Sequence, residues 1–200
     1  MSRTTQGVRY AEVDRETGET CVRVVLDLEG GTRRDVSTGI AFFDHMLIQL
    51  AFHGRIDLGI NSEGDLHIDD HHTVEDVGIV LGRAIQQALL EDPIVRFGSN
   101  QTVMDDALVL VAMDISGRGQ AYVDLGFKRE KIGDLSTECV KEFFSAVAAN
   151  AGITLHIKRL SGENEHHICE AAFKGFGRAL YEATRTVERR GPSSTKGQIG

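Results

Sequence analysis

The sequence contains a long internal repeat, which constrains the fold strongly because each copy must form the same unit. Residues 42–60 align with residues 139–157 at a constant offset of 97, and apolar positions match apolar positions. Six identities recur 95 positions later: His71, His72, Glu75, Gly82, Arg83 and Ala84 match His166, His167, Glu170, Gly177, Arg178 and Ala179. The chain is therefore predicted to consist of two fused copies of one unit.

The two copies are predicted to span residues 1–95 and 96–190, with a C-terminal tail at residues 191–200. In each copy, alternating apolar residues indicate two strands, and a 3.6-residue period then indicates a helix, followed by another strand and helix. The offset is 87 upstream of residues 126–134, so an insertion is expected there. Such a β-β-α-β-α unit cannot cover its helices alone. We therefore expect an α+β fold, with the helices of both copies packed as a bundle between two mixed sheets.

Composition excludes several classes of protein. The 30 acidic and 22 basic residues give a net charge of −8, which disfavours nucleic acid and anionic lipid as partners. Three unclustered cysteines indicate reduced thiols and packing roles in a reducing compartment. The sequence has neither an apolar run of the roughly 20 residues that span a membrane nor a signal-peptide pattern, so a cytoplasmic location is expected.

The repeated His-His-x-x-Glu segment is the strongest chemical signal. If a helix starts near Asp69 or Asp70, with these aspartates as caps, then His71, His72 and Glu75 project from one turn. Adjacent histidines point about 100° apart on a helix, so the pair is expected to serve two ions or two partners. A single pair of this kind is most often a surface or capping feature, and its recurrence in register favours metal ligands.

Further residues extend this hypothesis. His45 lies on the preceding helix and aligns with Glu142 in the second copy, and both side chains are candidate ligands. A set of imidazole and carboxylate donors without thiolate favours Mn, Fe, Zn or Ni. By repeat symmetry alone, His53 is expected to be a packing or surface residue.

Three basic loops form a weaker signal. Arg96, Arg118 and Lys196 of the tail could gather as an anion site, and the alternative is solvated surface charge. Nucleotide-binding and serine-nucleophile motifs are absent from the sequence.

Several ordered motifs resemble one enzyme family. They are FFDHML (42–47), DDHHTVEDVG (69–78), ITLHI (153–157), GENEHHICEAAFK (162–174) and PSSTKG (192–197). Together these motifs resemble the imidazoleglycerol-phosphate dehydratases of histidine biosynthesis in their monofunctional form. The resemblance implies a duplicated fold of the ribosomal protein S5 domain 2-like type.

The resemblance also implies a site with two Mn²⁺ ions. Its metal ligands would be His45, His71, His72, Glu75, Glu142, His166, His167 and Glu170. The family commonly has His where this chain has Glu142. The catalytic set would be Glu19, His71, His72 and Glu75, with Glu19 as the acid–base residue. Substrate contacts would come from these four residues and from His45, His53, Arg96, Arg118, Lys174, Ser194, Thr195 and Lys196, the basic groups and tail hydroxyls holding phosphate.

The implied reaction is the dehydration of D-erythro-imidazoleglycerol phosphate to imidazole acetol phosphate. No carbonyl activates the C–H bonds of this substrate, so a metal-bound imidazolate that passes through a diazafulvene is the expected route. The family also implies a homo-oligomer of 24 subunits with active sites between subunits.

Two alternatives remain open from the residues alone. The same ligands could serve a metal-dependent phosphohydrolase with water as nucleophile. A ferritin-like metal-binding scaffold would also use His and Glu, although its Glu-x-x-His order on long helices differs from the order here.

Overall fold

The computed structural model describes residues 9–89 and 93–187. The first half contains β1 (Tyr10–Glu16), β2 (Thr20–Asp27), β3 (Arg34–Ser37), α1 (Ala41–Gly54), β4 (Asp57–Gly64) and α2 (His71–Ala88). The second half contains β5 (Phe97–Met104), β6 (Ala107–Ile115), β7 (Gln120–Asp124), β8 (Lys131–Ile132), β9 (Leu135–Ser136), α3 (Thr137–Ala151), β10 (Ile153–Ser161) and α4 (Glu165–Thr184).

The two four-stranded sheets have the same strand order. The first is β1-β2-β4-β3 and the second is β5-β6-β10-β7. In each sheet the last pair is parallel and the other pairs are antiparallel. The expected α+β class with two mixed sheets is therefore confirmed. The short β8–β9 ribbon lies where the change of offset placed an insertion.

Each four-stranded sheet has one strand more than the sequence pattern predicts, namely β1 and β5. Both are edge strands, and most of their side chains are polar. In β1 only Ala11 and Val13 are buried, so the strand lacks the apolar alternation that would identify it. Its backbone pairing with β2 extends over all seven residues of β1, so the strand forms by pairing without a strong apolar face.

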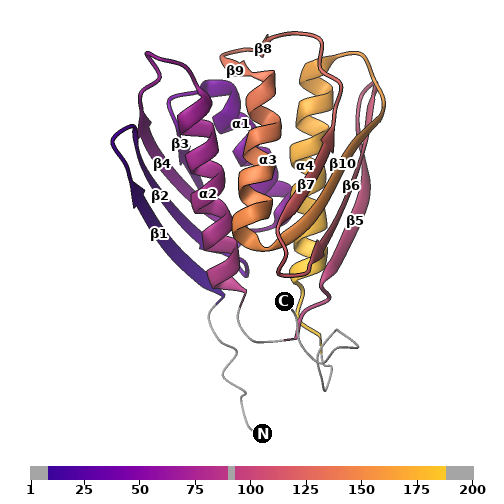
Figure 1. The fold of residues 1–200 in the computed structure, drawn as a ribbon. Helices are drawn as coiled ribbons and strands as arrows, with labels where there is room; N and C mark the ends of the chain where they lie inside the picture. The colour runs from indigo at the N-terminus through magenta and orange to yellow at the C-terminus, as the bar shows by residue number, and fades with distance from the viewer. Residues whose placement is uncertain (1–8, 90–92, 188–200) are drawn as a thin grey trace, which may run out of the picture.

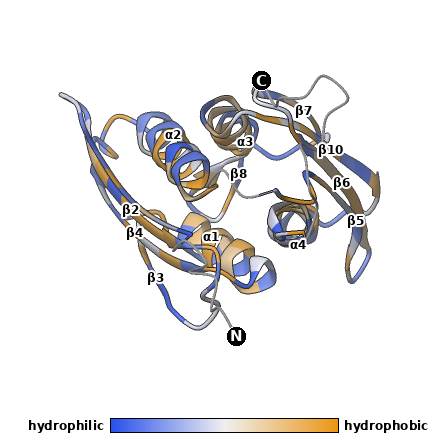
Figure 2. Ribbon diagram, turned by 90° about the horizontal axis from the view of Figure 1, so that it is seen from below, coloured by the Kyte–Doolittle hydropathy of each residue, from blue (hydrophilic) through white to orange (hydrophobic). Residues whose placement is uncertain are grey.

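The four long helices lie between the two sheets, as Figures 1 and 2 show. Helix α2 packs against α3, and α1 packs against α4, so both helix pairs join the two halves. The centre is aromatic, with Phe43 of α1 meeting Phe143 of α3 and Phe173 of α4. The repeated units therefore share a single core.

Two glycines at equivalent repeat positions let these helices approach closely. A Cβ at Gly82 of α2 would lie 2.7 Å from the carbonyl oxygen of Val147 in α3. A Cβ at Gly177 of α4 would overlap the carbonyl oxygen of Leu50 in α1. Any larger residue must therefore push the helix pair apart.

The environments of the three cysteines test the expectation that these residues pack in the core. All three cysteines are free, and Cys139 and Cys169 are buried, whereas Cys21 is exposed on the outer face of β2. The packing role expected for Cys21 is therefore wrong, because alternate residues of a strand point to opposite faces of the sheet. None of the described helices is long and apolar enough to cross a membrane.

Candidate functional site

Six of the eight predicted ligand residues lie at the starts of α2 and α4, whereas His45 lies on α1 and Glu142 on α3. Helices α2 and α4 both begin at the end of the molecule that carries the β8–β9 ribbon, at the top of Figure 1. The repeat thus places both His-His-x-x-Glu segments on the same edge of the helical layer.

The two helices begin with different caps. At α2, the Asp69 carboxylate accepts a hydrogen bond from the backbone N–H of His71 at 2.9 Å, as predicted for a cap. Asp70 does not cap the helix with its side chain, because its carboxylate accepts from the backbone N–H and hydroxyl of Ser136 instead. At α4, the Asn164 side chain accepts from the backbone N–H groups of His166 and His167.

His45, His166 and Glu170 form a three-donor group, which we call the α1–α4 cluster. Glu170 Oε2 lies 3.1 Å from His166 Nε2 and 3.7 Å from His45 Nε2. The Glu170 side chain is only 7% exposed, and its Oε1 lies 2.5 Å from Lys174 Nζ. Burial opposes ionisation of Glu170, but Lys174 and His166 outweigh burial and lower its pKa. The result is a buried, ionised carboxylate with one oxygen directed at two imidazoles.

The equivalent residues of α2 form a looser group. His71 Nε2 lies 3.8 Å from Glu75 Oε2, and both side chains are more than two-fifths exposed. Glu142 of α3 aligns with His45 but belongs to neither group of potential metal donors found among the described residues. Among the described residues, Glu142 therefore joins no set of three donors that lie within 4.8 Å of one another.

The second histidine of each pair points toward a different carboxylate. His72 Nδ1 lies 3.0 Å from Asp65 Oδ2 and 3.8 Å from Glu19 Oε2, and these three residues form a second group of potential metal donors. The hydrogen bond to Asp65 raises the pKa of His72 despite partial burial. His167 Nδ1 lies 2.7 Å from Asp106 Oδ1. The two histidines of each pair therefore contact different carboxylates, as predicted from the angle of about 100° between adjacent residues on a helix.

Two of the three predicted basic loops meet at one carboxylate. Arg96 binds Asp114 through two nitrogens, at 2.6 and 3.1 Å, and Arg118 Nη2 lies 3.9 Å from the same side chain. The hydrogen bond to Asp114 raises the pKa of Arg96. The tail residues Ser194, Thr195 and Lys196 lie outside the described residues.

His53 lies near the end of α1, and Lys174 lies on α4 close enough to affect the charge of His53. His53 lines a hollow at the end of α1 together with Arg55, Asn100 and Arg178. Burial lowers the pKa of His53, and the positive charges of Lys174 and Arg178 lower it further. Two arginines and one glutamate, Glu182, line the hollow, and this excess of positive charge suits a negatively charged group.

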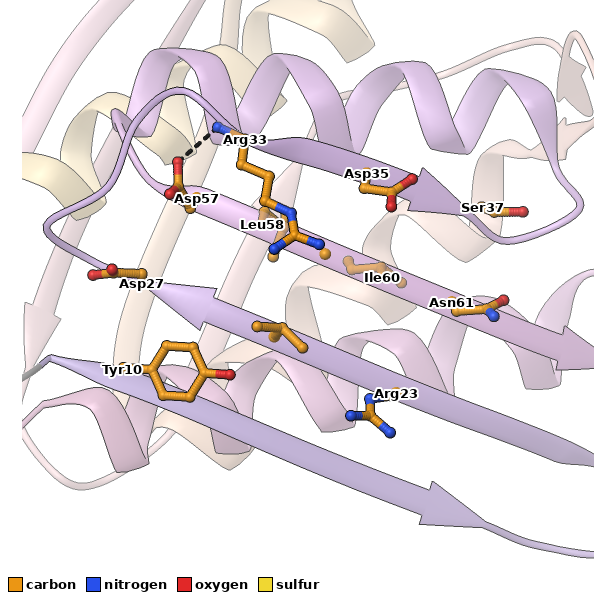
Figure 3. A pocket seen from close by; sticks show the side chains of 12 residues that line it. Tyr10, Arg23, Asp27, Arg33, Asp35, Ser37, Asp57, Leu58, Ile60 and Asn61 are labelled. Atoms are coloured by element: carbon orange, nitrogen blue, oxygen red, sulfur yellow. Dashed lines mark hydrogen bonds between the residues drawn. The ribbon is translucent and has the colours of Figure 1, made fainter.

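The cavity of about 450 Å³ in Figure 3 lies elsewhere, on the outer face of the first sheet. Tyr10, Arg23 and Asp35 line it, and Asp57 at its edge accepts from the backbone N–H of Arg33. None of the predicted site residues lines this cavity, so it is separate from the candidate metal site.

Sequence reasoning missed three carboxylates that hold site residues: Asp65, Asp106 and Asp114. For Asp106 a signal existed, because it lies 87 positions after Glu19, at the offset found for the strands beside both residues. Asp114 likewise lies 87 positions after an identical residue, Asp27, whereas Asp65 has no distinguishing pattern, and only the fold brings Asp65 to His72 and Asp114 to Arg96.

Imidazole and carboxylate donors within 4.8 Å of one another suit divalent ions such as Mn²⁺. The fold and this donor set define a class: duplicated α+β proteins whose helix starts carry histidine and carboxylate groups of the kind that hold metals in enzymes.

The comparisons give the particular family. Residues 38–180 match the family model of imidazoleglycerol-phosphate dehydratase, and the chain belongs to this family of hydro-lyases in histidine biosynthesis. The enzyme so named from Acetivibrio thermocellus is 55% identical over 96% of this chain and 99% of the relative. Its counterpart from Cereibacter sphaeroides is 52% identical over 96% of this chain and all of the relative.

Solved structures agree with this assignment. The dehydratase from Pyrococcus furiosus matches with a TM-score of 0.82 and 44% identity, covering 92% of this chain and 99% of that one. The enzyme from Staphylococcus aureus matches with a TM-score of 0.81 and 35% identity, covering 89% and 99% respectively.

Proposed function

We propose that this chain dehydrates D-erythro-imidazoleglycerol phosphate to imidazole acetol phosphate in L-histidine biosynthesis. The observation that carries the proposal is the α1–α4 cluster, in which two imidazoles and a buried carboxylate converge from separate helices. Family membership over nearly the whole chain supports the choice of substrate.

The cofactor in this proposal is Mn²⁺, with two ions in each active site. Their proposed ligands are His45, His71, His72, Glu75, Glu142, His166, His167 and Glu170. When bound, such ions supply Lewis-acid polarisation and a template for the imidazole ring. Lys174 neutralises one oxygen of Glu170 and so leaves the other oxygen directed at the histidines.

Glu19 is the proposed acid–base residue. It lies in the β1–β2 hairpin, its side chain is 59% exposed, and its carboxylate is 3.8 Å from His72 Nδ1. The hydroxyl that leaves is on the substrate carbon next to the ring, and the proton that must leave is on the middle carbon of the chain, where a carboxylate beside a ligand histidine can act as the base. Glu19 would take this proton from the carbon and later return one, while His72 and Asp65 stay in place.

Arg96 and Arg118 are the proposed phosphate contacts. Both side chains converge on Asp114, which neutralises part of their charge and fixes Arg96 in one orientation. Lys174, His53 and the tail residues Ser194, Thr195 and Lys196 complete the proposed set. A phosphate held in this way would orient the substrate chain so that one proton faces Glu19.

The proposal also places the protein in the cytoplasm, as an assembly of 24 copies of the chain with active sites between subunits. Within one chain, His72 and His167 point away from the partners of His71 and His166, so neither histidine joins the α1–α4 cluster. A ligand set completed by another copy accounts for this division. Removing the metal should therefore shift the protein to smaller species on a sizing column.

The decisive assay incubates the purified full chain with imidazoleglycerol phosphate, with and without Mn²⁺. Formation of a ketone that depends on Mn²⁺ supports the dehydratase. Release of inorganic phosphate without ketone would support the phosphohydrolase alternative, and metal uptake without any turnover would support the scaffold.

A further inference from the structure

The second histidine of each pair contacts a carboxylate through the same ring nitrogen. His72 Nδ1 meets Asp65, and His167 Nδ1 meets Asp106. A carboxylate can only accept hydrogen bonds, so Nδ1 must carry the proton in each contact. The lone pair of the neutral ring then lies on Nε2, which becomes the nitrogen able to bind a metal.

The two carboxylates come from different parts of the duplicated unit. Asp106 lies in the β5–β6 hairpin, at the position that corresponds to Glu19 in the β1–β2 hairpin. Besides His167, Asp106 accepts hydrogen bonds from the backbone N–H groups of Glu163 and Asn164, at 2.7 and 3.0 Å. Both oxygens of this carboxylate therefore bind groups at or just before the start of α4.

In the first half, a residue outside the hairpin holds the second histidine. Asp65, in the segment between β4 and α2, makes the hydrogen bond to His72, and Glu19 stays 3.8 Å from the same nitrogen. The Asp65 side chain is 17% exposed, whereas that of Glu19 is 59% exposed. The less exposed carboxylate, Asp65, holds the ring, and the more exposed one, Glu19, faces solvent.

We propose that Asp65 is a positioning residue that fixes His72 with Nε2 free for the metal, and that it thereby leaves Glu19 available for proton transfer. Asp106 holds His167 in the same way in the second half. The inference rests on the proposed function for the presence of the metal and for the role of Glu19. Carboxylates that orient a ligand histidine also increase its basicity, and their loss typically weakens metal binding about 10–100-fold.

Direct coordination by Asp65 is the competing arrangement. Its Oδ1 is buried and has no hydrogen-bond partner among the described residues, and its carboxylate, Glu19 and His72 together offer three donors. A metal on Nδ1 would have to break the 3.0 Å hydrogen bond to Asp65, whereas a metal on Nε2 preserves it.

The first experiment measures Mn²⁺ affinity of the metal-stripped full chain by competition with a fluorescent chelator. We expect Asp65→Ala to bind about 10–100-fold more weakly, and Asp65→Asn to lie between it and the wild type because an amide oxygen still accepts the Nδ1–H. Glu63→Gln, which removes an exposed negative charge two residues away, is the matched control and should bind normally. Equal losses in Asp65→Ala and Glu63→Gln would reduce the effect to general charge and overturn the inference.

The second half provides a paired test. Asp106→Asn should weaken Mn²⁺ binding, whereas Asp105→Asn should not, although Asp105 lies 3.5 Å from His167 Nε2. Asp105 has a φ of 47°, which Asn tolerates well, so this control keeps the hairpin conformation. A larger loss for Asp105→Asn than for Asp106→Asn would reverse the assignment.

The third experiment separates positioning from a merely structural role. Nitrogen-15 NMR of the histidine rings in the metal-free protein should show His72 protonated at Nδ1 in the wild type and in Asp65→Asn, and a mixture of tautomers in Asp65→Ala. Equal melting temperatures of the metal-free variants would exclude unfolding. A crystal structure of the Mn²⁺-loaded protein with the metal on Nδ1, or on Asp65, would contradict the inference.

Failure of the inference is distinguishable from failure of the proposed function. If the wild type lacks dehydratase activity but shows these affinities and tautomers, the assignment of Asp65 survives and the substrate is wrong. If the wild type is active and Asp65→Ala binds Mn²⁺ as tightly, the role of Asp65 is wrong.

Discussion

The starts of α2 and α4 carry the same His-His-x-x-Glu segment in different surroundings. The Glu170 side chain is 7% exposed and contacts Lys174, His166 and His45. Glu75, at the equivalent position, is 46% exposed and lies beside His71 at 3.8 Å. The difference arises from the neighbouring helices, because α1 brings His45 to α4, whereas the corresponding Glu142 of α3 does not join a donor group at α2.

The duplication thus kept the positions of the His and Glu residues, whereas the carboxylates that contact the second histidine differ between the two halves. In the second half, the hairpin carboxylate Asp106 contacts His167 and accepts hydrogen bonds from the backbone of the loop before α4. In the first half a loop carboxylate, Asp65, holds the histidine, and the hairpin carboxylate Glu19 is exposed. In the proposed function, the second half is therefore the better arranged for metal binding, and the first half has an exposed carboxylate, Glu19, available for proton transfer.

The largest effect is expected at Glu19. Glu19→Gln should lower kcat by roughly 10²–10⁴-fold, the usual contribution of general acid–base catalysis, because the amide cannot take a proton. Mn²⁺ affinity and the melting temperature should stay unchanged, and Glu16→Gln on the exposed end of β1 is the control. Steady-state kinetics with near-normal kcat in Glu19→Gln would remove Glu19 from the mechanism and erase this difference between the halves.

The next effect in size is expected at His45, compared with Glu142, its counterpart in the other half of the proposed metal site. His45→Ala removes a donor from the α1–α4 cluster and should weaken Mn²⁺ binding by at least the roughly 10–100-fold typical of outer-shell losses. Glu142→Ala should have a smaller effect, because this chain leaves Glu142 outside the cluster. If chelator competition gives equal losses of Mn²⁺ affinity for both variants, then Glu142 contributes to metal binding as much as His45 in the assembled protein.

Alanine at the two helix glycines tests packing in the two halves. Gly177→Ala forces a methyl group against the Leu50 carbonyl and should destabilise the protein by about 1–3 kcal/mol, the usual range for overpacking. Gly82→Ala should cost less, because its nearest contact, the Val147 oxygen at 2.7 Å, is less severe and alanine favours the helix by about 1 kcal/mol. Denaturant unfolding of both variants gives the order, and the reverse order would contradict the contact geometry.

The smallest effect is expected at Asp57, which aligns with Thr154 in the second half. Backbone N–H groups of Arg33, Gly31 and Thr32 lower the pKa of Asp57. The contribution of its ionised form to stability should therefore be present above the ordinary pKa of about 3.9, and it should be lost as pH falls through the lowered value.

The measurement is the melting temperature of Asp57→Asn and the wild type against pH. The variant should melt a few degrees lower at neutral pH, and the difference should disappear in acid. Thr154→Val, which removes a hydroxyl 3.1 Å from that of Ser116, should give a difference that does not change with pH. A pH-independent difference at Asp57 would show that its charge contributes nothing.

Much of the fold was predictable because apolar periodicity records which residues face the core. The two sheets, the helices between them and the insertion near β8 and β9 follow from that pattern and from the repeat. Strands β1 and β5 did not follow, since edge strands with mostly polar residues carry little periodicity. Asp70 occupies the N-cap position of α2, but its side chain does not cap the helix, because it accepts hydrogen bonds from Ser136, 66 residues away.

The local sequence was sufficient to place His71 with Glu75 and His166 with Glu170, because residues four apart lie on one face of a helix whatever surrounds it. Their final partners depend on elements distant in the chain: His45 reaches Glu170 through the packing of α1 on α4, and Asp106 reaches His167 through a hairpin turn. Helical periodicity acts over a single turn, whereas contacts between elements depend on how the whole core packs. The motif thus defined the donors, and the packing of the two halves assigned each donor its partner.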